Sequence, residues 1–550
     1  MVEQLPEGRP AHLRMLDRVS RPGSDASRGI HRTATTFFTA AFFILLVVLL
    51  PIWMLAGGHP YPGSFDLILI LWVIVAYAGW RLTTFLFVSE IRLATSVFWL
   101  FVYVAFGLAP LAEISRQTWP VTPADTSAHT LELAAVLVLV GCASFDLVPR
   151  LTRSWRRPAP VNPARESAVP VSPSRPERHT LNERRLWLLS VISLVATPLA
   201  IVKLGGISVL FSNRAAVESA LINNGLYGSV SSDQLVGGSK VGASLITTGI
   251  TTPVYLCFLV WTVIFLRRRE ARDRRTSTRE IVLWVLLLAA NVILNNPISN
   301  PRYWFVTIAI SFLAARPKFL LENFRRLLVA AVLFAIVVFP YSDYFRQSTP
   351  GEKIGAQSPQ ETLATKDYDV FPMLASTTSF VRDNGLQAGR QALGVVLFAL
   401  PRSVWPNKPV DTGTVLAGYL HNDQNYNLSS SLWSEGYIDF GPIGVLAYLA
   451  LLGIAALLLD RRYSALRHQR AGPLSIFAVA APIFAGYELI ILRGPLLQAT
   501  GRAVVLLVAL LFVFSGGRGR SISPSPANEL GRVNPGPTDD RPRELQHSAR

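Results

Sequence analysis

Long runs of apolar residues alternate with short polar segments along most of the chain, from Thr36 to Phe514. Many of these runs hold about 17–25 residues, which is the length of α-helix that crosses a hydrocarbon core of about 30 Å. The pattern predicts twelve membrane-spanning helices, over residues 36–56, 65–80, 93–113, 128–148, 186–206, 243–266, 280–296, 301–315, 327–340, 441–459, 474–492 and 499–515. We therefore expect an all-α, polytopic integral membrane protein.

Lysine and arginine are concentrated in alternate connections between these runs. If the N-terminus faces the cytoplasm, the inward-facing segments hold 38 of the 52 basic residues. The positive-inside rule then predicts a multi-pass protein of the cytoplasmic membrane with both termini in the cytoplasm. The net charge of +17 is explained by this topology and by contact with anionic membrane lipid, so we expect no nucleic-acid partner.

The remaining segments complete the predicted organisation. Residues 1–35 are polar and contain no cleavage-site pattern, which favours a cytoplasmic tail over a signal peptide. Segments rich in proline and arginine are typical of disorder. The predicted parts are a tail (1–35), helices (36–148), a disordered cytoplasmic loop (149–185), helices (186–340), an outward loop (341–440), helices (441–515) and a disordered cytoplasmic tail (516–550).

The outward loop 341–440 is the longest connection between predicted helices, and its pattern predicts a partly helical structure. It contains the decapeptide "LPRSVWPNKP", residues 400–409. Proline removes a backbone donor and stops a helix, so Arg402 and Lys408 are expected on a stiff turn at the membrane boundary. That turn could hold a pyrophosphate group, or it could be an interfacial anchor in which Trp405 and Lys408 fix the depth of the loop.

Two further arginines are predicted near the outer face. Arg302 begins an apolar helix and either snorkels to the interface or faces a polar cavity. Arg346 follows Asp343 by three residues, a spacing at which an ion pair is an alternative explanation. Several arginines at one face suggest an anionic, membrane-bound ligand, because the planar guanidinium makes paired bonds to phosphate.

The decapeptide, a polar stretch and then "SEGYIDFGPIGVLAYLALLG" together resemble the Wzy-type polymerases of O-antigen and oligosaccharide repeat units. The resemblance implies a glycosyltransferase that joins polyprenyl-pyrophosphate-linked oligosaccharide units into a cell-surface polysaccharide outside the cytoplasmic membrane. It also implies flippase and chain-length regulator proteins as partners. By the same resemblance Arg302, Arg346 and Arg402 would hold pyrophosphate or stabilise it as it leaves, and Lys408 and Tyr437 would contact the substrate.

This chemistry is expected to need no cofactor and no metal, because pyrophosphate is already a good leaving group and arginines can neutralise its charge. The candidates for the general base are Glu435 and His421. Alternatively, "SEGYIDFG" is the first turn of the following helix, capped by Ser434 or Asp439. The D-x-D spacing at Asp367–Asp369 is set aside as a metal motif, because it arises easily by chance.

Two other functions remain open. A ligase that moves finished glycan to another acceptor would be favoured by an essential His421. A flippase or exporter of lipid-linked oligosaccharide would need charged residues deep in several helices. We expect the interiors of the helices to be nearly uncharged, which favours chemistry at the outer face.

Overall fold

The computed structural model describes residues 37–60, 63–87, 91–154, 180–212, 217, 220, 239–271, 276–338, 359–364, 368–421, 428–466 and 474–515. The described ranges fold into helices, and their β-pairing is limited to an isolated bridge between Thr180 and Ser475. The first half contains η1 (Leu45–Leu49), α3 (Leu50–Leu55), α4 (Phe65–Thr84), α5 (Leu93–Phe101), η2 (Val102–Leu108), α6 (Ala109–Arg116), α7 (Ala128–Ser154), α8 (Glu183–Lys203), α9 (Ile207–Leu210) and α11 (Ser239–Ala271). The second half contains α12 (Thr278–Leu294), α13 (Arg302–Ala314), α14 (Pro317–Leu333), η4 (Phe334–Val338), α17 (Pro359–Leu363), α18 (Val370–Asn384), α19 (Arg390–Val396), α20 (Thr412–Tyr419), α21 (Leu432–Ala465), α22 (Phe477–Arg493) and α23 (Leu496–Phe514).

Eight helices in the described part of the chain are long and apolar enough to cross a membrane. They cover Phe37–Leu55, Phe65–Thr84, Leu93–Arg116, Ala128–Leu151, Glu183–Lys203, Thr248–Glu270, Leu432–Ala465 and Leu496–Phe514. The expectation of a helical, multi-pass membrane protein is therefore confirmed. The other four predicted segments overlap the shorter helices α12, α13, α14 with η4, and α22, so a total of twelve spans stays a prediction.

Two helix starts differ most from the expected ones. Helix α14 begins at Pro317, inside the segment predicted as a cytoplasmic connection. Helix α21 begins at Leu432, ahead of the predicted start at residue 441, and bends at Phe440 and Gly441. Gly441 has φ 64°, a conformation that glycine adopts without strain. The bend lies at the predicted start, so the apolar run in the sequence covers only the part of α21 after the bend.

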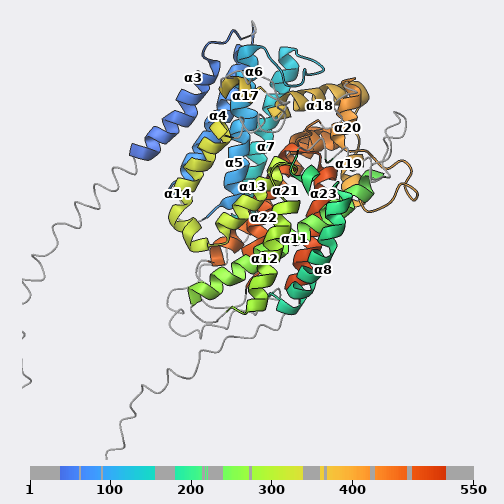
Figure 1. Cartoon of the computed structure of the whole chain (residues 1–550). Helices are drawn as coiled ribbons and strands as arrows, with labels where there is room; N and C mark the ends of the chain where they lie inside the picture. Colours follow the sequence, from blue (N-terminus) through green and yellow to red (C-terminus); the bar gives the residue numbers. More distant parts are fainter. Residues whose placement is uncertain are drawn as a thin grey trace, which may run out of the picture.

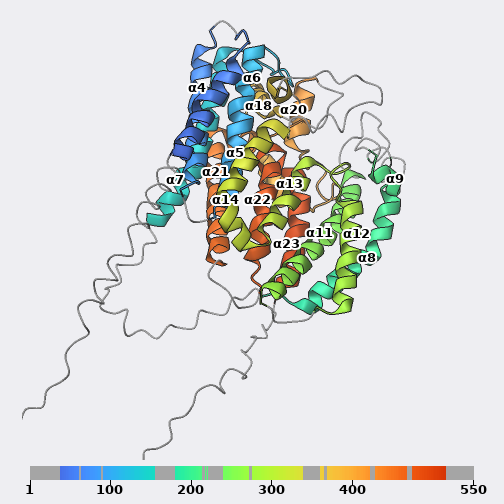
Figure 2. The ribbon, with the colours of Figure 1, turned by 60° about the vertical axis from the view of Figure 1, so that its left-hand side comes forward.

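The described residues form two large hydrophobic cores and two smaller ones. In Figure 2, α4, α5 and α7 lie on one side, α8, α11 and α12 lie on the other, and α21, α22 and α23 lie between them. Helix α22 packs closely on α13, because a Cβ atom on Gly486 would lie only 2.4 Å from Thr307 Cα. Cys142 and Cys257 are buried free thiols in the two large cores.

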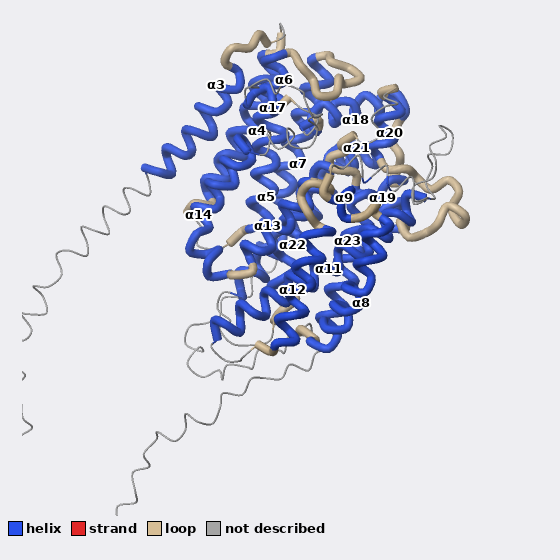
Figure 3. The backbone as a smooth tube through the Cα atoms, viewed as in Figure 1, coloured by secondary structure: helices blue, strands red, loops and turns tan. Residues whose placement is uncertain are grey.

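Three helices, α18, α19 and α20, gather at one end of the bundle (Figure 1), with loops between them (Figure 3). We call residues 368–421 the cover, and the end of the bundle on which they lie the cover end. The cover shares a small apolar core with the bundle, formed by Val121, Met373, Phe380, Leu416, Ala417, Leu428 and Ile438. This core fixes the position of the cover on α21 and α7. The outward orientation of the cover remains a prediction.

Several predicted segments lie outside the described residues. These are the tails 1–35 and 516–550, most of the loop 149–185, and residues 341–358 of the predicted outward loop.

Candidate functional site

The proline-rich turn at residues 400–409 is held together by its own cations. The Arg402 guanidinium donates to the carbonyl oxygens of Lys408 (2.7 Å) and Pro409 (3.4 Å). The Lys408 ammonium donates to the carbonyl oxygens of Phe398 and Leu400, and only 9% of Lys408 is exposed. Burial lowers the pKa of both side chains, and the Arg402 charge lowers that of Lys408 further. Both cations therefore close the turn. This role differs from both predicted ones, which were the binding of pyrophosphate and anchoring at the membrane interface.

Replacing Lys408 with methionine is expected to loosen this turn. The variant keeps most of the apolar stem but leaves two carbonyl oxygens without their donor, which costs about 1–3 kcal/mol locally. Hydrogen exchange of the backbone amides in residues 398–410 should accelerate, while exchange in α21 stays unchanged. Equal exchange in the variant and the wild type would show that the prolines alone hold the turn.

The start of α21 is capped by a residue that the sequence did not single out. Ser431 is the N-cap, and its hydroxyl accepts from the Ser434 amide at 3.1 Å. Asp439 instead accepts from the backbone amides of Gln391 (3.0 Å) and Ala392 (2.8 Å) at the start of α19. The prediction that Ser434 or Asp439 caps this helix was therefore wrong, because Asp439 joins α21 to the cover.

The two predicted bases lie in different surroundings. Glu435 is buried, and its Oε1 accepts from the amide of Leu496, the first residue of α23. His421 is exposed at the end of α20 with φ 51°. Within the described residues, no hydrogen bond joins the His421 ring to Glu435. The structure thus places Glu435 inside the cover end and His421 at the surface.

Tyr437 and Arg346 were also predicted to contact the substrate. Tyr437 is half-buried against the larger hydrophobic core. Arg346 lies outside the described residues, so its role in binding pyrophosphate stays a prediction.

Three arginines lie at or near the ends of helices α13, α22 and α23. Arg302 is the first residue of α13, Arg493 is the last residue of α22, and Arg502 lies in the second turn of α23; we call these three residues the arginine cluster. The Arg502 guanidinium carbon lies 4.3 Å from the centre of the Trp304 ring, and Nη1 donates to the Tyr303 hydroxyl at 3.4 Å.

The sequence identified only Arg302 of these three. Arg502 could also have been found, because an ionisable residue inside a predicted span is by itself an indication of function. Arg493 gives no such signal in the sequence, since it lies at the end of an apolar run.

Asp369 connects the cover to the arginine cluster. Its Oδ1 lies 3.5 Å from Arg493 Nη2, and 38% of the Arg493 side chain is exposed. Asp369 also accepts from the hydroxyl and the backbone amide of Ser429. This residue belongs to the D-x-D spacing that we set aside, and it acts here as an anchor between the cover and α22. Among the described residues, no group of acids, histidines and cysteines has the proximity needed to hold a metal ion.

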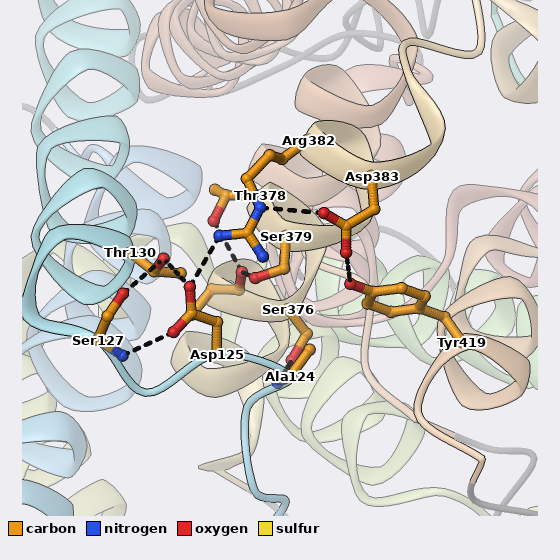
Figure 4. Close-up of polar contacts among 11 residues, drawn as sticks. Ala124, Asp125, Ser127, Thr130, Ser376, Thr378, Ser379, Arg382, Asp383 and Tyr419 are labelled. Carbon is orange, nitrogen blue, oxygen red and sulfur yellow. Dashed lines mark hydrogen bonds and ion pairs between the residues drawn. The ribbon is translucent and has the colours of Figure 1, made fainter.

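Four polar residues fasten another part of the cover (Figure 4). Arg382 of α18 donates to Asp125 (2.8 Å), before α7, and to Asp383 (3.0 Å), which accepts from the Tyr419 hydroxyl of α20. The hydrogen bond from Arg382 is the main reason that the pKa of Asp125 is held well below its usual range. Exposed ion pairs contribute little stability, so these contacts mainly set the orientation of the cover.

The interiors of the described helices contain more ionisable residues than expected. The buried ionisable residues are Arg81, Glu113, Asp146, Glu435, Asp439, Asp460 and Glu488. Arg81, Glu113 and Glu435 lie in the end turns of their helices, whereas the other four residues lie further inside. Neither carboxyl oxygen of Glu488, in α22, has a hydrogen-bond partner among the described residues. The expectation of nearly uncharged interiors was therefore wrong for the described helices.

The cover end of the bundle combines exposed and half-buried guanidinium groups with a buried carboxyl group and a fixed cover. Guanidinium groups in such a place can bind and orient an oxyanion such as a phosphate. Comparisons of the chain with protein-family models, with curated proteins and with solved structures found no match.

Proposed function

We propose that the protein is a glycosyltransferase that joins polyprenyl-pyrophosphate-linked oligosaccharide repeat units at the outer face of the cytoplasmic membrane. The observation that carries this proposal is the position of the arginine cluster, at helix ends beside a fixed cover. A lipid-linked substrate would place its pyrophosphate at this depth, because its polyprenyl tail stays in the membrane and its sugars lie in water.

In the proposed reaction, an acceptor hydroxyl oxygen forms a bond to the anomeric carbon of the growing chain. The bond between that carbon and the pyrophosphate oxygen breaks, and the polyprenyl pyrophosphate leaves with the bonding electron pair. Arg493 and Arg302 would stabilise the negative charge that develops on the leaving group. Arg502 would act as a positioning residue, since it binds Tyr303 and stacks on Trp304, both next to Arg302.

The proton of the acceptor hydroxyl needs a general base. Glu435 is the candidate, because its contact with the Leu496 amide ties it to the turn between α22 and α23 that carries Arg493. Arg402 has a different part in this proposal. Its bonds to Lys408 and Pro409 keep the turn closed, so it positions the cover and does not hold pyrophosphate.

The test uses the purified full chain in lipid nanodiscs, supplied with lipid-linked oligosaccharide extracted from its host. We expect a ladder of longer lipid-linked chains that grows with time on a gel. Product that forms only after a second glycan acceptor is added would replace the polymerase with a ligase. Unchanged oligosaccharide, combined with its movement across the membrane of sealed vesicles, would overturn the enzyme proposal in favour of a flippase.

A further inference from the structure

A basic cavity lies at the end of the bundle opposite the cover. It has a volume of about 410 Å³ and is lined by Leu266, Arg269, Glu270 and Arg316. The first three residues are at the end of α11, and Arg316 is in the short turn between α13 and α14. The cavity thus brings together two arginines that are far apart in the sequence.

The two arginines of the cavity differ from their neighbour Arg268. Arg268 forms ion pairs with Glu280 (2.9 Å) and Glu183 (3.1 Å), so its charge is compensated within the protein. The side chains of Arg269 and Arg316 are exposed, and neither makes a hydrogen bond or an ion pair within the described residues. Glu270 also lines the cavity, and it makes no ion pair with Arg269 or Arg316 within the described residues. The cavity therefore retains two guanidinium groups that are available to an anion.

The surroundings of the cavity are those of a membrane boundary. The apolar part of α11 ends at Leu266, where the cavity begins. Leu313 and Phe319 lie three residues before and after Arg316, and each is 43% exposed. A ligand held between the arginines can therefore lie with an apolar part against exposed apolar side chains.

We propose that this cavity binds the phosphate headgroup of an acidic phospholipid. Each guanidinium can make paired, charge-assisted bonds to phosphate oxygens, and basic pockets between membrane helices are known to take acidic lipid headgroups. Leu266, Leu313 and Phe319 give the acyl chains an apolar surface, which a free phosphate ion would not use. This site is distinct from the arginine cluster, and the proposal does not depend on the glycosyltransferase activity.

The test measures lipid binding to the full chain in detergent by native mass spectrometry, with dioleoyl phosphatidylglycerol and dioleoyl phosphatidylcholine as probes. We expect the phosphatidylglycerol to bind more tightly. The double variant Arg269→Gln/Arg316→Gln should weaken its binding about 30-fold, a factor of about five for each arginine. The matched control is Lys318→Gln/Arg325→Gln, which removes the same charge from exposed positions of α14 that do not line the cavity.

Three outcomes would overturn the proposal. They are equal losses in the two double variants, equal binding of the two lipids, and displacement of phosphatidylglycerol by inorganic phosphate, which would indicate a site for the free ion. The thermal unfolding midpoint of both variants, measured without added lipid, shows whether a loss of binding comes from unfolding.

Discussion

Replacing Arg493 with glutamine is expected to reduce the rate of chain extension about 100-fold, the usual effect of removing one donor from a developing oxyanion. Arg493 contacts the cover through Asp369, and 38% of its side chain is exposed. The loss should appear in kcat at saturating lipid-linked oligosaccharide, because the charge on the leaving group develops in the transition state.

The Arg493→Lys variant separates charge from geometry. Lysine keeps the positive charge but lacks the planar fork that binds two phosphate oxygens. We therefore expect activity between those of the glutamine variant and the wild type. The matched control is Arg390→Gln, since Arg390 is exposed on the cover and donates to the Asn407 carbonyl oxygen instead of to the bundle.

Two results would contradict this role. One is equal activity of the Arg493→Gln and Arg390→Gln variants. The other is a loss in Arg493→Gln that Asp369→Asn reproduces in full together with faster hydrogen exchange of α18, which would mean that Arg493 only anchors the cover.

The membrane helices could be predicted from the sequence because a long apolar run has few other stable structures in a lipid bilayer. Each of the twelve predicted segments overlaps a described helix. The sequence left the start of α21 open, because Ser434, Glu435 and Asp439 interrupt the apolar pattern there. In the structure these three side chains are buried: Ser434 contacts the Ser431 hydroxyl, and Glu435 and Asp439 accept from the backbone amides of Leu496 and Gln391. An apolar pattern cannot reveal a helical turn whose burial depends on a distant part of the chain.

The candidate site also depends on contacts between distant parts of the chain, which the sequence pattern does not show. The sequence placed Arg402 and Lys408 on a stiff turn, which the structure has, but the direction of their side chains depends on which carbonyl oxygens the turn leaves open. Arg302 was identified from its position, whereas Arg502 reaches Tyr303 and Trp304, the two residues after Arg302, only through helix packing. Arg493 likewise reaches Asp369 of the cover only in the folded structure. Local patterns thus predicted the kind of residue at the site, and tertiary packing decided which arginines belong to it.

Replacing Asp146 with asparagine is expected to lower the free energy of unfolding by about 3–5 kcal/mol, the usual cost of leaving a buried charge without its partner. Arg81 and Asp146 join α4 to α7 at 2.7 Å, and the two side chains are only 8% and 7% exposed. Three aromatic rings surround the Arg81 guanidinium, those of Trp80, Phe85 and Trp99. Without Asp146, this cation stays buried among apolar groups.

Replacing the other partner of the pair, Arg81→Met, should lower the free energy of unfolding less than Asp146→Asn does. Asp146 would keep its contacts with Arg150 (2.7 Å) and the Tyr77 hydroxyl (3.1 Å), so its charge would remain partly compensated. Arg150→Gln is the matched control, because Arg150 is 48% exposed and the pair should contribute no more than about 1 kcal/mol.

A double-mutant cycle measured by denaturant unfolding in mixed micelles tests this interpretation. We expect the Arg81→Met/Asp146→Asn variant to be more stable than Asp146→Asn alone, because removing the buried cation removes the main penalty. Additive losses in the cycle would show that the two charges act independently, and that packing alone joins α4 to α7. If the double variant loses less stability than the sum of the two single losses, the two charges are coupled. The ion pair would then favour the contact between α4 and α7, because either charge without the other is costly in the bundle.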